Sequence, residues 1–287
     1  MILIIGSNGQ LGTQMQKKLS ATGKRYCALD YPDVDITNMN SLSRLIAHIK
    51  PRTIVNCAAY TNVDKAETEP EAVYAVNALG PRNLARLCNA EGIELMHVST
   101  DYVFDGEPIV EGGQPRPYVE TDPCAPATVY GKTKLEGETF VQSECDKWYI
   151  LRTAWLYGEG ANFVRTMLKL AETNDTLRVV DDQIGSPTST VEMAEAICTM
   201  IVSGRYGLYH ATCEGQCSWF EFARKIFSLA GVDIRVEAVS SAEFLRPAKR
   251  PNWSVLENAR LKEAGINTFR HWEDALSEYL LAENVNL

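Results

Sequence analysis

The sequence predicts an α/β fold: a doubly wound parallel Rossmann sheet with a smaller, intercalated α/β domain towards the C-terminus. Three observations lead to this prediction. The apolar segment 2–5 reads as a buried strand, and it runs directly into a turn with three glycines and then into a helical pattern. Short apolar segments then alternate with amphipathic helices as far as residue 157, as βαβ units do. Beyond that residue the alternation loosens, and a chain of 287 residues is long enough for a second, smaller unit.

Composition and charge limit the class of protein. Hydrophobic residues make up 45% of the chain and charged residues 23%, which is ordinary globular usage. The formal net charge of −9 argues against a nucleic-acid partner, which normally binds a basic face. No segment approaches the roughly 18 consecutive apolar residues of a membrane helix, so no membrane partner is expected. The eight cysteines are scattered through the chain, as expected of reduced thiols, and this predicts a cytoplasmic location. The closest pair, Cys213 and Cys217, is expected to pack in the interior and not to bind a metal.

The turn after the first strand holds Gly6, Gly9 and Gly12. One glycine permits the tight turn, one lets a pyrophosphate approach backbone N–H groups, and one lets the helix pack closely on the strand. The place of this turn, directly after a buried strand, predicts dinucleotide binding. A second strand, about residues 25–29, ends at Asp30, where such folds place an acid on the adenosine ribose; a plain turn aspartate is the alternative. An acid there should repel a 2′-phosphate, so NADH competence is expected and strict NADPH dependence is not.

Further polar residues follow the next strands. Asp35 and Ile36 open a predicted helix, and they either edge an adenine or serve as an N-cap and a core residue. The strand 53–56 leads into small residues that let a cofactor approach closely. A strand over 95–98 delivers the hydroxyls of Ser99 and Thr100 to the crevice at the carboxyl ends of the strands.

Two polar side chains lie within apolar patterns. Asn77 belongs to a predicted helix over about residues 71–89, and it either hydrogen-bonds a neighbouring strand or takes part in chemistry. His97 lies inside a strand and is interpreted as a core or partner-bonded histidine.

Tyr130 and Lys134 lie four residues apart on a predicted helix and therefore on one helix face. A phenol is a poor acid or base at neutral pH, and a nearby cation lowers its pKa, so the pair is able to protonate a reduced carbonyl. The spacing alone is common on helix surfaces, and it gains weight only from the dinucleotide turn at the same sheet edge.

The remaining segments carry less specific signals. Residues 106–126 are rich in proline and glycine and are expected to form a loop that covers the crevice. Trp155, after a fifth strand over 148–152, either walls a sugar pocket or packs at a domain interface. Lys249 and Arg250 are able to bind a diphosphate, and they are equally well interpreted as solvated surface residues. The later pattern predicts strands over 177–180 and 207–210, the second returning to the first sheet, a turn over 183–188, and helices over about 163–172, 191–202, 218–229, 256–264 and 272–281.

Four motifs together resemble the extended short-chain dehydrogenase/reductase superfamily: the glycine turn, Asn56–Ala59, Ser99–Phe104 and Tyr130-x-x-x-Lys134. Longer segments, spread through most of the chain, are similar to the dTDP-4-dehydrorhamnose reductase family. They are 56–67 (NCAAYTNVDKAE), 99–106 (STDYVFDG), 129–136 (VYGKTKLE), 152–155 (RTAW) and 182–188 (DQIGSPT).

The resemblance implies NAD(P)H-dependent reduction of the C4 ketone of dTDP-4-dehydro-L-rhamnose, the last step of dTDP-rhamnose synthesis for cell-surface polysaccharide. It implies that Tyr130 protonates the developing alkoxide, that Lys134 lowers the pKa of Tyr130 and binds the nicotinamide ribose, and that Thr100 hydrogen-bonds the C4 oxygen. The residues implied to contact the substrate are Val63, Thr100, Asp101 and Trp155. Those implied to contact the cofactor are Gly6, Gly9, Gln10, Leu11, Gly12, Asp30, Asp35, Ile36, Ala58, Ala59, Tyr60, Thr61, Tyr130 and Lys134.

The two expected units are an NAD(P)-binding Rossmann domain, residues 1–157, and a sugar-nucleotide-binding domain, about 158–189 and 213–287, with about 190–212 returning to the first. NADPH or NADH is the expected cofactor, and a dTDP-sugar is the expected partner. Some members of the family are described as magnesium-bridged dimers. No motif here supports Mg²⁺, so no metal ligand is assigned, and the chain is expected to be a monomer or a homodimer.

Two alternatives remain at this stage. A nucleotide-sugar epimerase or 4,6-dehydratase shares the fold and the tyrosine–lysine pair, but Tyr102 follows Asp101 where a dehydratase usually has a second acid. A non-catalytic regulatory subunit is able to lose catalytic groups without penalty, whereas this chain retains Thr100, Tyr130 and Lys134 together.

Overall fold

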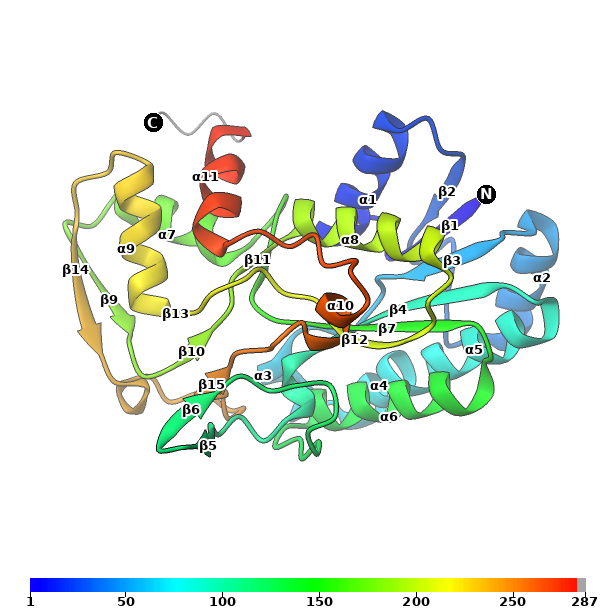
Figure 1. The fold of residues 1–287 in the computed structure, drawn as a ribbon, viewed down its shortest axis with the longest axis horizontal. Helices are drawn as coiled ribbons and strands as arrows, with labels where there is room; N and C mark the ends of the chain where they lie inside the picture. The colour runs from blue at the N-terminus through cyan, green and yellow to red at the C-terminus, as the bar shows by residue number, and fades with distance from the viewer. Residues whose placement is uncertain (283–287) are drawn as a thin grey trace.

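A computed structural model describes residues 1–282 and shows a central sheet with helices on both faces (Figure 1). Within these residues the sheet has six strands in the order β12-β7-β4-β3-β1-β2, and every neighbouring pair is parallel. The predicted doubly wound sheet is confirmed, and residues 207–210 do return to it beside β7. The strands are β1 (Ile2–Ile5), β2 (Tyr26–Leu29), β3 (Thr53–Asn56), β4 (Glu94–Thr100), β7 (Trp148–Thr153) and β12 (Gly207–His210).

Alternate residues of each strand belong to two separate hydrophobic cores, because successive side chains of a strand point to opposite faces of the sheet. In β1, Ile4 belongs to one core, and Leu3 and Ile5 belong to the other. Both faces of the sheet are thereby buried, as a parallel sheet requires. The helices that contribute to the first core include α1 (Gln10–Ala21) and α8 (Thr190–Ser203); those that contribute to the second are α2 (Met39–Ile49), α5 (Gly80–Glu91) and α6 (Val129–Glu144).

Helix α2 begins later than predicted. Asn38 caps it, since its Oδ1 accepts a hydrogen bond from the backbone N–H of Ser41 at 3.1 Å. Asp35 lies in the preceding turn, where its Oδ1 accepts from the N–H and the hydroxyl of Thr37. The N-cap interpretation of Asp35 is therefore wrong, because an asparagine three residues later offers its oxygen where the helix begins. Ile36 is 5% exposed and belongs to the second core.

The helix predicted over 71–89 is divided into α4 (Pro70–Tyr74), a π-helical turn η1 (Ala75–Leu79) and α5, and a short helix α3 (Val63–Ala66) precedes it. Asn77 lies in η1 and is 1% exposed. Its Oδ1 accepts from the N–H of Tyr60 at 2.8 Å, and its Nδ2 donates to the Tyr60 carbonyl at 3.0 Å. The partner of this buried asparagine is thus the segment after β3, which it holds in place, and not a strand.

The segment 106–126 contains a two-stranded hairpin that its prediction as a loop missed, formed by β5 (Ile109–Glu111) and β6 (Gln114–Arg116). Gly112 and Gly113 make its turn with φ values of 60° and 82°, and two successive positive φ values suit a tight hairpin turn. Beside the hairpin lies a third, smaller core, in which the rings of Phe104 and Tyr118 stack at 4.1 Å.

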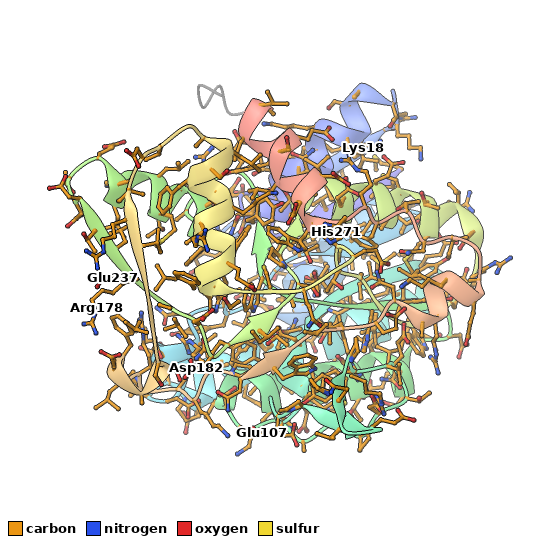
Figure 2. The ribbon with its side chains drawn as sticks, turned by 60° about the vertical axis from the view of Figure 1, so that its left-hand side comes forward. Lys18, Glu107, Arg178, Asp182, Glu237 and His271 are labelled. Carbon is orange, nitrogen blue, oxygen red and sulfur yellow. The ribbon has the colours of Figure 1, made fainter. Side chains whose placement is uncertain are left out.

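The later part of the chain forms short sheets: β13-β10-β15, β11-β8 and β14-β9. Figure 2 shows Arg178 and Glu237 on the ribbons of β9 and β14. Strand β14 (Arg235–Val239) was not predicted. The turn predicted over 183–188 contains β10 and the start of β11. The helix predicted over 256–264 is shorter than expected, because only α10 (Ala259–Glu263) forms there. The division of the chain near residue 157 stays a prediction. The strands are β8 (Leu156–Tyr157), β9 (Thr176–Val180), β10 (Ile184–Gly185), β11 (Thr188–Ser189), β13 (Cys217–Ser218), β14 (Arg235–Val239) and β15 (Trp253–Ser254); the helices are α7 (Phe163–Ala171), α9 (Trp219–Leu229), α10 (Ala259–Glu263) and α11 (Trp272–Ala282), with 3-10 turns η2 (Asp101–Val103) and η3 (Ser241–Glu243).

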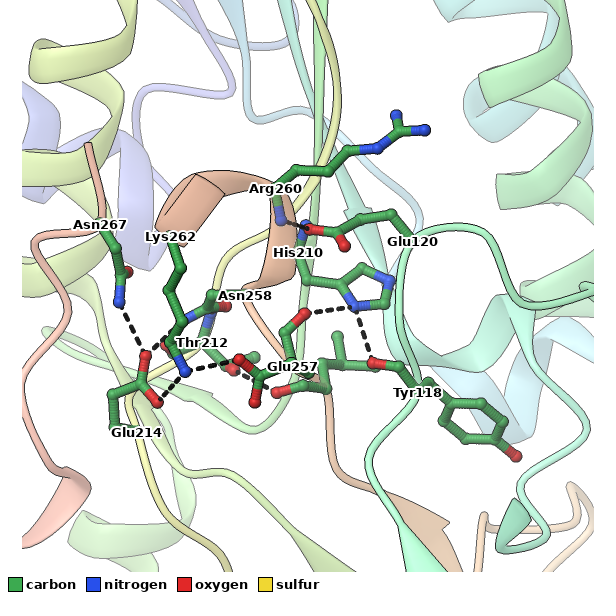
Figure 3. A network of polar contacts seen from close by, with 11 residues as sticks. Tyr118, Glu120, His210, Thr212, Glu214, Glu257, Asn258, Arg260, Lys262 and Asn267 are labelled. Atoms are coloured by element: carbon green, nitrogen blue, oxygen red, sulfur yellow. Dashed lines mark hydrogen bonds and ion pairs between the residues drawn. The ribbon is translucent and has the colours of Figure 1, made fainter. Parts of the chain in front are cut away.

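A polar network fastens the chain around α10 to β12 and the segment after it (Figure 3). The backbone N–H of His210 donates to Glu120 Oε1 at 2.9 Å, and Asn258 bonds both the N–H and the carbonyl of Thr212. His210 is completely buried, and burial lowers its pKa to about 3, so its ring is neutral at physiological pH. These bonds fix the last part of the chain against the edge of the central sheet.

Within residues 1–282, no helix is both long and apolar enough to cross a membrane. All eight cysteines are free thiols. Cys213 and Cys217 are buried, and burial raises the pKa of Cys213 to about 12, as expected of a packed thiol.

Candidate active site

A cavity of about 1340 Å³ lies where strands of the central sheet end, and residues from the first half of the chain and from the later half line it. Tyr60 is absent from the described residues that line this cavity: its phenol donates to Glu69 at 2.6 Å instead. Residues 106–126 are absent from the lining as well, so the expectation that this loop covers the crevice is not met. The predicted site residues that line the cavity are Gly6, Gly9, Gln10, Leu11, Gly12, Asp30, Asp35, Ile36, Ala58, Ala59, Thr61, Val63, Thr100, Asp101, Tyr130, Lys134 and Trp155.

The glycine turn has the form that a dinucleotide requires. Gly6 has φ of 80°, and a Cβ there would collide with the backbone of Ala58; a Cβ on Gly12 would collide with the Gly6 carbonyl. The N-terminus of α1 has no side-chain cap and no acidic residue in its first turn. Its free N–H groups and the positive end of the helix dipole therefore suit a pyrophosphate. The residues present thus fit NADH or NADPH.

Asp30 is held beside this turn by backbone groups. Its Oδ2 accepts from the N–H of Asn8 at 2.7 Å, and its Oδ1 accepts from the N–H of Tyr31 at 2.8 Å. The carboxylate is therefore oriented at the end of β2, next to the glycine turn, and more firmly than an unsupported turn aspartate would be.

Tyr130 lies in the first turn of α6, which Thr128 caps by accepting from the N–H of Gly131 at 3.0 Å. The ring of Tyr102 meets that of Tyr130 edge-on, with centroids 5.4 Å apart. Burial raises the pKa of Tyr130 to about 12, although interaction with the Thr100 hydroxyl lowers it in part. The phenol is consequently protonated at physiological pH.

Lys134 lies one turn further along α6 and is 2% exposed. Its Nζ donates to the Val98 carbonyl at 2.6 Å and lies 3.5 Å from His97 Nε2. Burial lowers the pKa of Lys134 to about 8, and burial together with Lys134 lowers the pKa of His97 well below its usual value. His97 also contacts Asn56, at 3.1 Å, and is therefore a partner-bonded core histidine, as predicted.

The expectation that Lys134 lowers the pKa of Tyr130 is not met in the structure. The pKa of Tyr130 is raised because removal of the phenolate from water outweighs the interactions that favour it. Spacing in the sequence placed both groups on one helix face, but it gave no measure of how deeply that face is buried.

Thr100 and Asp101 end β4 and begin η2, and both are 6% exposed. Thr100 Oγ1 donates to Asp101 Oδ1 at 2.9 Å, and Ser254 Oγ donates to Asp101 Oδ2 at 2.6 Å. Burial raises the pKa of Asp101 to about 6, although the bonds from Ser254 and Thr100 oppose this rise. Ser99 bonds elsewhere: its hydroxyl donates to Glu138 at 2.5 Å.

Glu138 is completely buried and is paired with Arg152, whose Nη2 lies 2.7 Å from its Oε2. This ion pair joins α6 to β7 directly behind the site. Removal of one partner would leave an unpaired buried charge, so the pair fixes the position of the helix that carries Tyr130 and Lys134.

Trp155 lies between the cavity and α9, and its contact with a sugar stays a prediction. It lines the cavity, and its ring stacks on that of Trp219 from α9, with centroids 3.5 Å apart and an angle of 8° between the planes. Its φ of 47° is unusual for a bulky residue, and Gly185 leaves room for the indole, because a Cβ there would collide with it.

Several cavity residues from the later part of the chain were not predicted from the sequence; they include Phe163, Gln183, Trp219, Phe244 and Ser254. An aromatic residue at the start of a helix with a Ser–Glu capping box was the available signal for Trp219. Lys249 and Arg250 also line the cavity; they pair with Glu107 and Asp64 at 2.9 and 2.8 Å. The buried Nη1 of Arg250 has no partner among the described residues, which leaves it available to an anion.

Among residues 1–282, no cluster of three or more His, Cys, Asp and Glu side chains is arranged to hold a metal ion.

Comparison with known proteins identifies the family. A dTDP-4-dehydrorhamnose reductase from Mycobacterium tuberculosis (strain CDC 1551 / Oshkosh) is 43% identical over 285 residues, which cover 98% of this chain and 92% of that protein. The crystal structure of a dTDP-4-dehydrorhamnose reductase from Clostridium acetobutylicum ATCC 824 matches with a TM-score of 0.94 and 46% identity, covering 98% of this chain and 99% of that one. The structure of a dTDP-4-dehydrorhamnose reductase from Bacillus anthracis str. Ames in complex with NADP matches with a TM-score of 0.93 and 40% identity, covering 98% of each chain. Residues 1–285 match the model of the family described as the RmlD substrate binding domain, and the chain therefore belongs to that family.

Proposed function

We propose that this chain is an NAD(P)H-dependent oxidoreductase that reduces the C4 ketone of dTDP-4-dehydro-L-rhamnose to dTDP-L-rhamnose, the last step of dTDP-rhamnose synthesis for cell-surface polysaccharide. One observation carries the proposal: Thr100, Tyr130 and Lys134 line the same cavity as the glycine turn. The relatives that bear the name of this reductase match nearly the whole chain and support it.

Each group has a role that its surroundings favour. A bound reduced nicotinamide supplies the hydride. Tyr130, whose pKa of about 12 keeps it protonated, donates its proton to the developing alkoxide. Lys134, Val63 and Trp155 line the cavity, which supports binding of the nicotinamide ribose by Lys134 and contact of Val63 and Trp155 with the sugar. The Arg250 guanidinium, which lines the cavity, is suited to the diphosphate of the substrate.

The residues at the cofactor end of the cavity suit NADH and NADPH to different degrees. The pyrophosphate would lie at the N-terminus of α1, and Asp30 would accept hydrogen bonds from the adenosine ribose hydroxyls. A carboxylate there repels a 2′-phosphate, which supports use of NADH, whereas the relative from Bacillus anthracis binds NADP. We propose that NADH and NADPH are both accepted.

The rival enzyme is a nucleotide-sugar epimerase or 4,6-dehydratase, which keeps one NAD through each turnover. The protein is assayed with dTDP-4-dehydro-L-rhamnose and either NADH or NADPH. Cofactor oxidation is measured, and the sugar product is identified by NMR. We expect one cofactor oxidised per sugar reduced at C4, and the corresponding UDP-sugar serves as a matched control for the nucleotide. A tightly held NAD that is recycled without net consumption would refute reduction and favour the rival.

We propose a cytoplasmic location, since the reduced thiols and the nicotinamide chemistry suit that compartment. A monomer or a homodimer is proposed as the working assembly, and sedimentation of the purified chain distinguishes them.

A further inference from the structure

The side-chain oxygen atoms of Ser254, Asp101 and Thr100 form a buried hydrogen-bonded chain next to Tyr130. Ser254 Oγ donates to one carboxyl oxygen of Asp101 at 2.6 Å, and Thr100 Oγ1 donates to the other at 2.9 Å. The three residues are between 3% and 6% exposed. The Thr100 hydroxyl also interacts with the Tyr130 phenol, so Thr100 connects the carboxyl of Asp101 to a phenol that lines the cavity.

The protonation state of Asp101 sets the direction of these bonds. An ionised carboxylate only accepts hydrogen bonds, so Thr100 must then spend its single hydrogen on Asp101. The same oxygen already accepts from the N–H of Tyr102 at 3.2 Å, which leaves one lone pair towards Tyr130. A protonated Asp101 donates to Thr100 instead, and the Thr100 hydrogen is then free to turn towards Tyr130.

We propose that Asp101 is the source of the proton that restores the Tyr130 hydroxyl after each reduction, that Thr100 conducts it, and that Ser254 positions the carboxyl. This inference rests on the proposed reductase function. The hydride adds to C4 of the sugar, and the Tyr130 O–H bond breaks as its proton passes to the C4 oxygen. The Thr100 proton then passes to the Tyr130 oxygen, and the Asp101 proton passes to Thr100. Asp101 is left as a carboxylate and regains a proton from water, so one hydride and one proton are added in total.

The pKa values of Asp101 and Tyr130 favour proton transfer from the carboxyl towards the phenolate. The pKa of Asp101 is about 6 and that of Tyr130 about 12, so transfer of a proton from the carboxyl to the phenolate runs strongly downhill. The titratable groups that act on this part of the site are the Tyr102 phenol on η2 and the Tyr130 phenol on α6, and the Arg250–Asp64 ion pair acts on Tyr102. Lys134 directs a hydrogen at the Val98 carbonyl, away from this chain of bonds.

Ser254 belongs to β15, 153 residues further along the chain than Asp101. The position of β15 is fixed by pairing with β10 and by a bond from the N–H of Trp253 to the Gly106 carbonyl at 2.9 Å. Because a donated hydrogen bond stabilises the carboxylate, Ser254 holds the pKa of Asp101 below the value that burial alone would give. It thereby keeps the carboxyl able to release its proton near neutral pH.

The experiment compares the wild type with Ser254→Ala, Ser254→Thr and Asp101→Asn. Infrared titration of the protein without substrate follows the protonated carboxyl band, and kcat is measured over the same pH range. We expect a wild-type midpoint near the Asp101 pKa of about 6 in both, with kcat falling above it. Ser254→Ala should move both midpoints upward by on the order of one pH unit, because the Asp101 carboxylate loses a hydrogen bond that stabilises it. Ser254→Thr should restore them, and Asp101→Asn should abolish the band and lower kcat on the order of 10²-fold.

Thr53→Val is the matched control, because it removes another buried hydroxyl that donates to a carboxylate, that of Glu94 at 2.8 Å, remote from the cavity lining. It should leave both midpoints in place. An infrared midpoint that moves in Ser254→Ala while the kcat profile stays unchanged would overturn the relay, and so would full activity of Asp101→Asn. Failure of the reductase proposal is distinguishable, since it would abolish turnover in every variant and leave the infrared titration intact.

Discussion

Replacing Lys134 with methionine is expected to stabilise the folded protein at neutral pH while it impairs the enzyme. Lys134 is 2% exposed, and burial lowers its pKa from 10.5 to about 8. Each pKa unit corresponds to about 1.36 kcal/mol, so the folded chain spends about 3 kcal/mol to keep this ammonium charged at pH 7. Methionine has a similar length and no charge. It forfeits the bond to the Val98 carbonyl, worth about 1.5–3 kcal/mol for a charged donor, so the net gain at pH 7 is about 1 kcal/mol.

The pH dependence of the difference is the sharper measurement. Between pH 8 and 10.5 the unfolded chain retains the Lys134 proton and the folded chain has released it, so the stability of the wild type rises with pH relative to that of Lys134→Met. From pH 7 to pH 10 the wild type should gain about 2.5 kcal/mol on the variant.

Urea unfolding at pH 7, 8.5 and 10, followed by the fluorescence of the five tryptophans, gives the free energies. Lys132→Met, on the exposed side of the same helix, is the matched control and should show no such trend. A difference between wild type and Lys134→Met that does not vary with pH would refute the lowered pKa of Lys134.

Three further substitutions test the remaining parts of the site. Tyr130→Phe should lower kcat by about 10²- to 10⁴-fold and leave the Kd for NADH near that of the wild type, because the phenol proton acts in the transition state; a kcat near the wild-type value would remove Tyr130 as the acid. Asp30→Ala should shift the ratio of kcat/KM values towards NADPH by relieving repulsion of the 2′-phosphate, and an unchanged ratio would exclude Asp30 from the ribose site. Gly185→Ala should displace the Trp155 indole, with which a Cβ would collide, and raise the KM for the sugar nucleotide more than it lowers kcat; quenching or a shift of tryptophan fluorescence should accompany it, and a wild-type KM would show that Trp155 does not shape the sugar site.

Local patterns predicted the first half of the site, because its residues follow strand ends in a regular βαβ succession. The glycine turn, Asp30, Thr100 and the Tyr130–Lys134 pair are each positioned by short-range geometry, and a parallel sheet brings the ends of its strands to one edge. Only the N-cap alternative for Asp35 failed, because Asn38, three residues later, caps α2 instead.

The other half of the site depends on contacts that no local pattern encodes. Ser254 meets Asp101, and Trp219 meets Trp155, only because short strands and helices of the later chain pack across the cavity. The direction of the Tyr130 pKa was equally inaccessible, since it depends on how far water is excluded, and burial is a property of the folded whole.

The return of β12 to the central sheet has a consequence for the nascent chain. Strand β7 pairs with β4 on one side and with β12 on the other, yet 53 residues separate the end of β7 from the start of β12. At about 5–20 residues per second, the ribosome leaves the outer edge of β7 open for roughly 3 to 10 s. An open strand edge is a template for pairing with another chain, so aggregation is favoured during this interval and a holding chaperone would help.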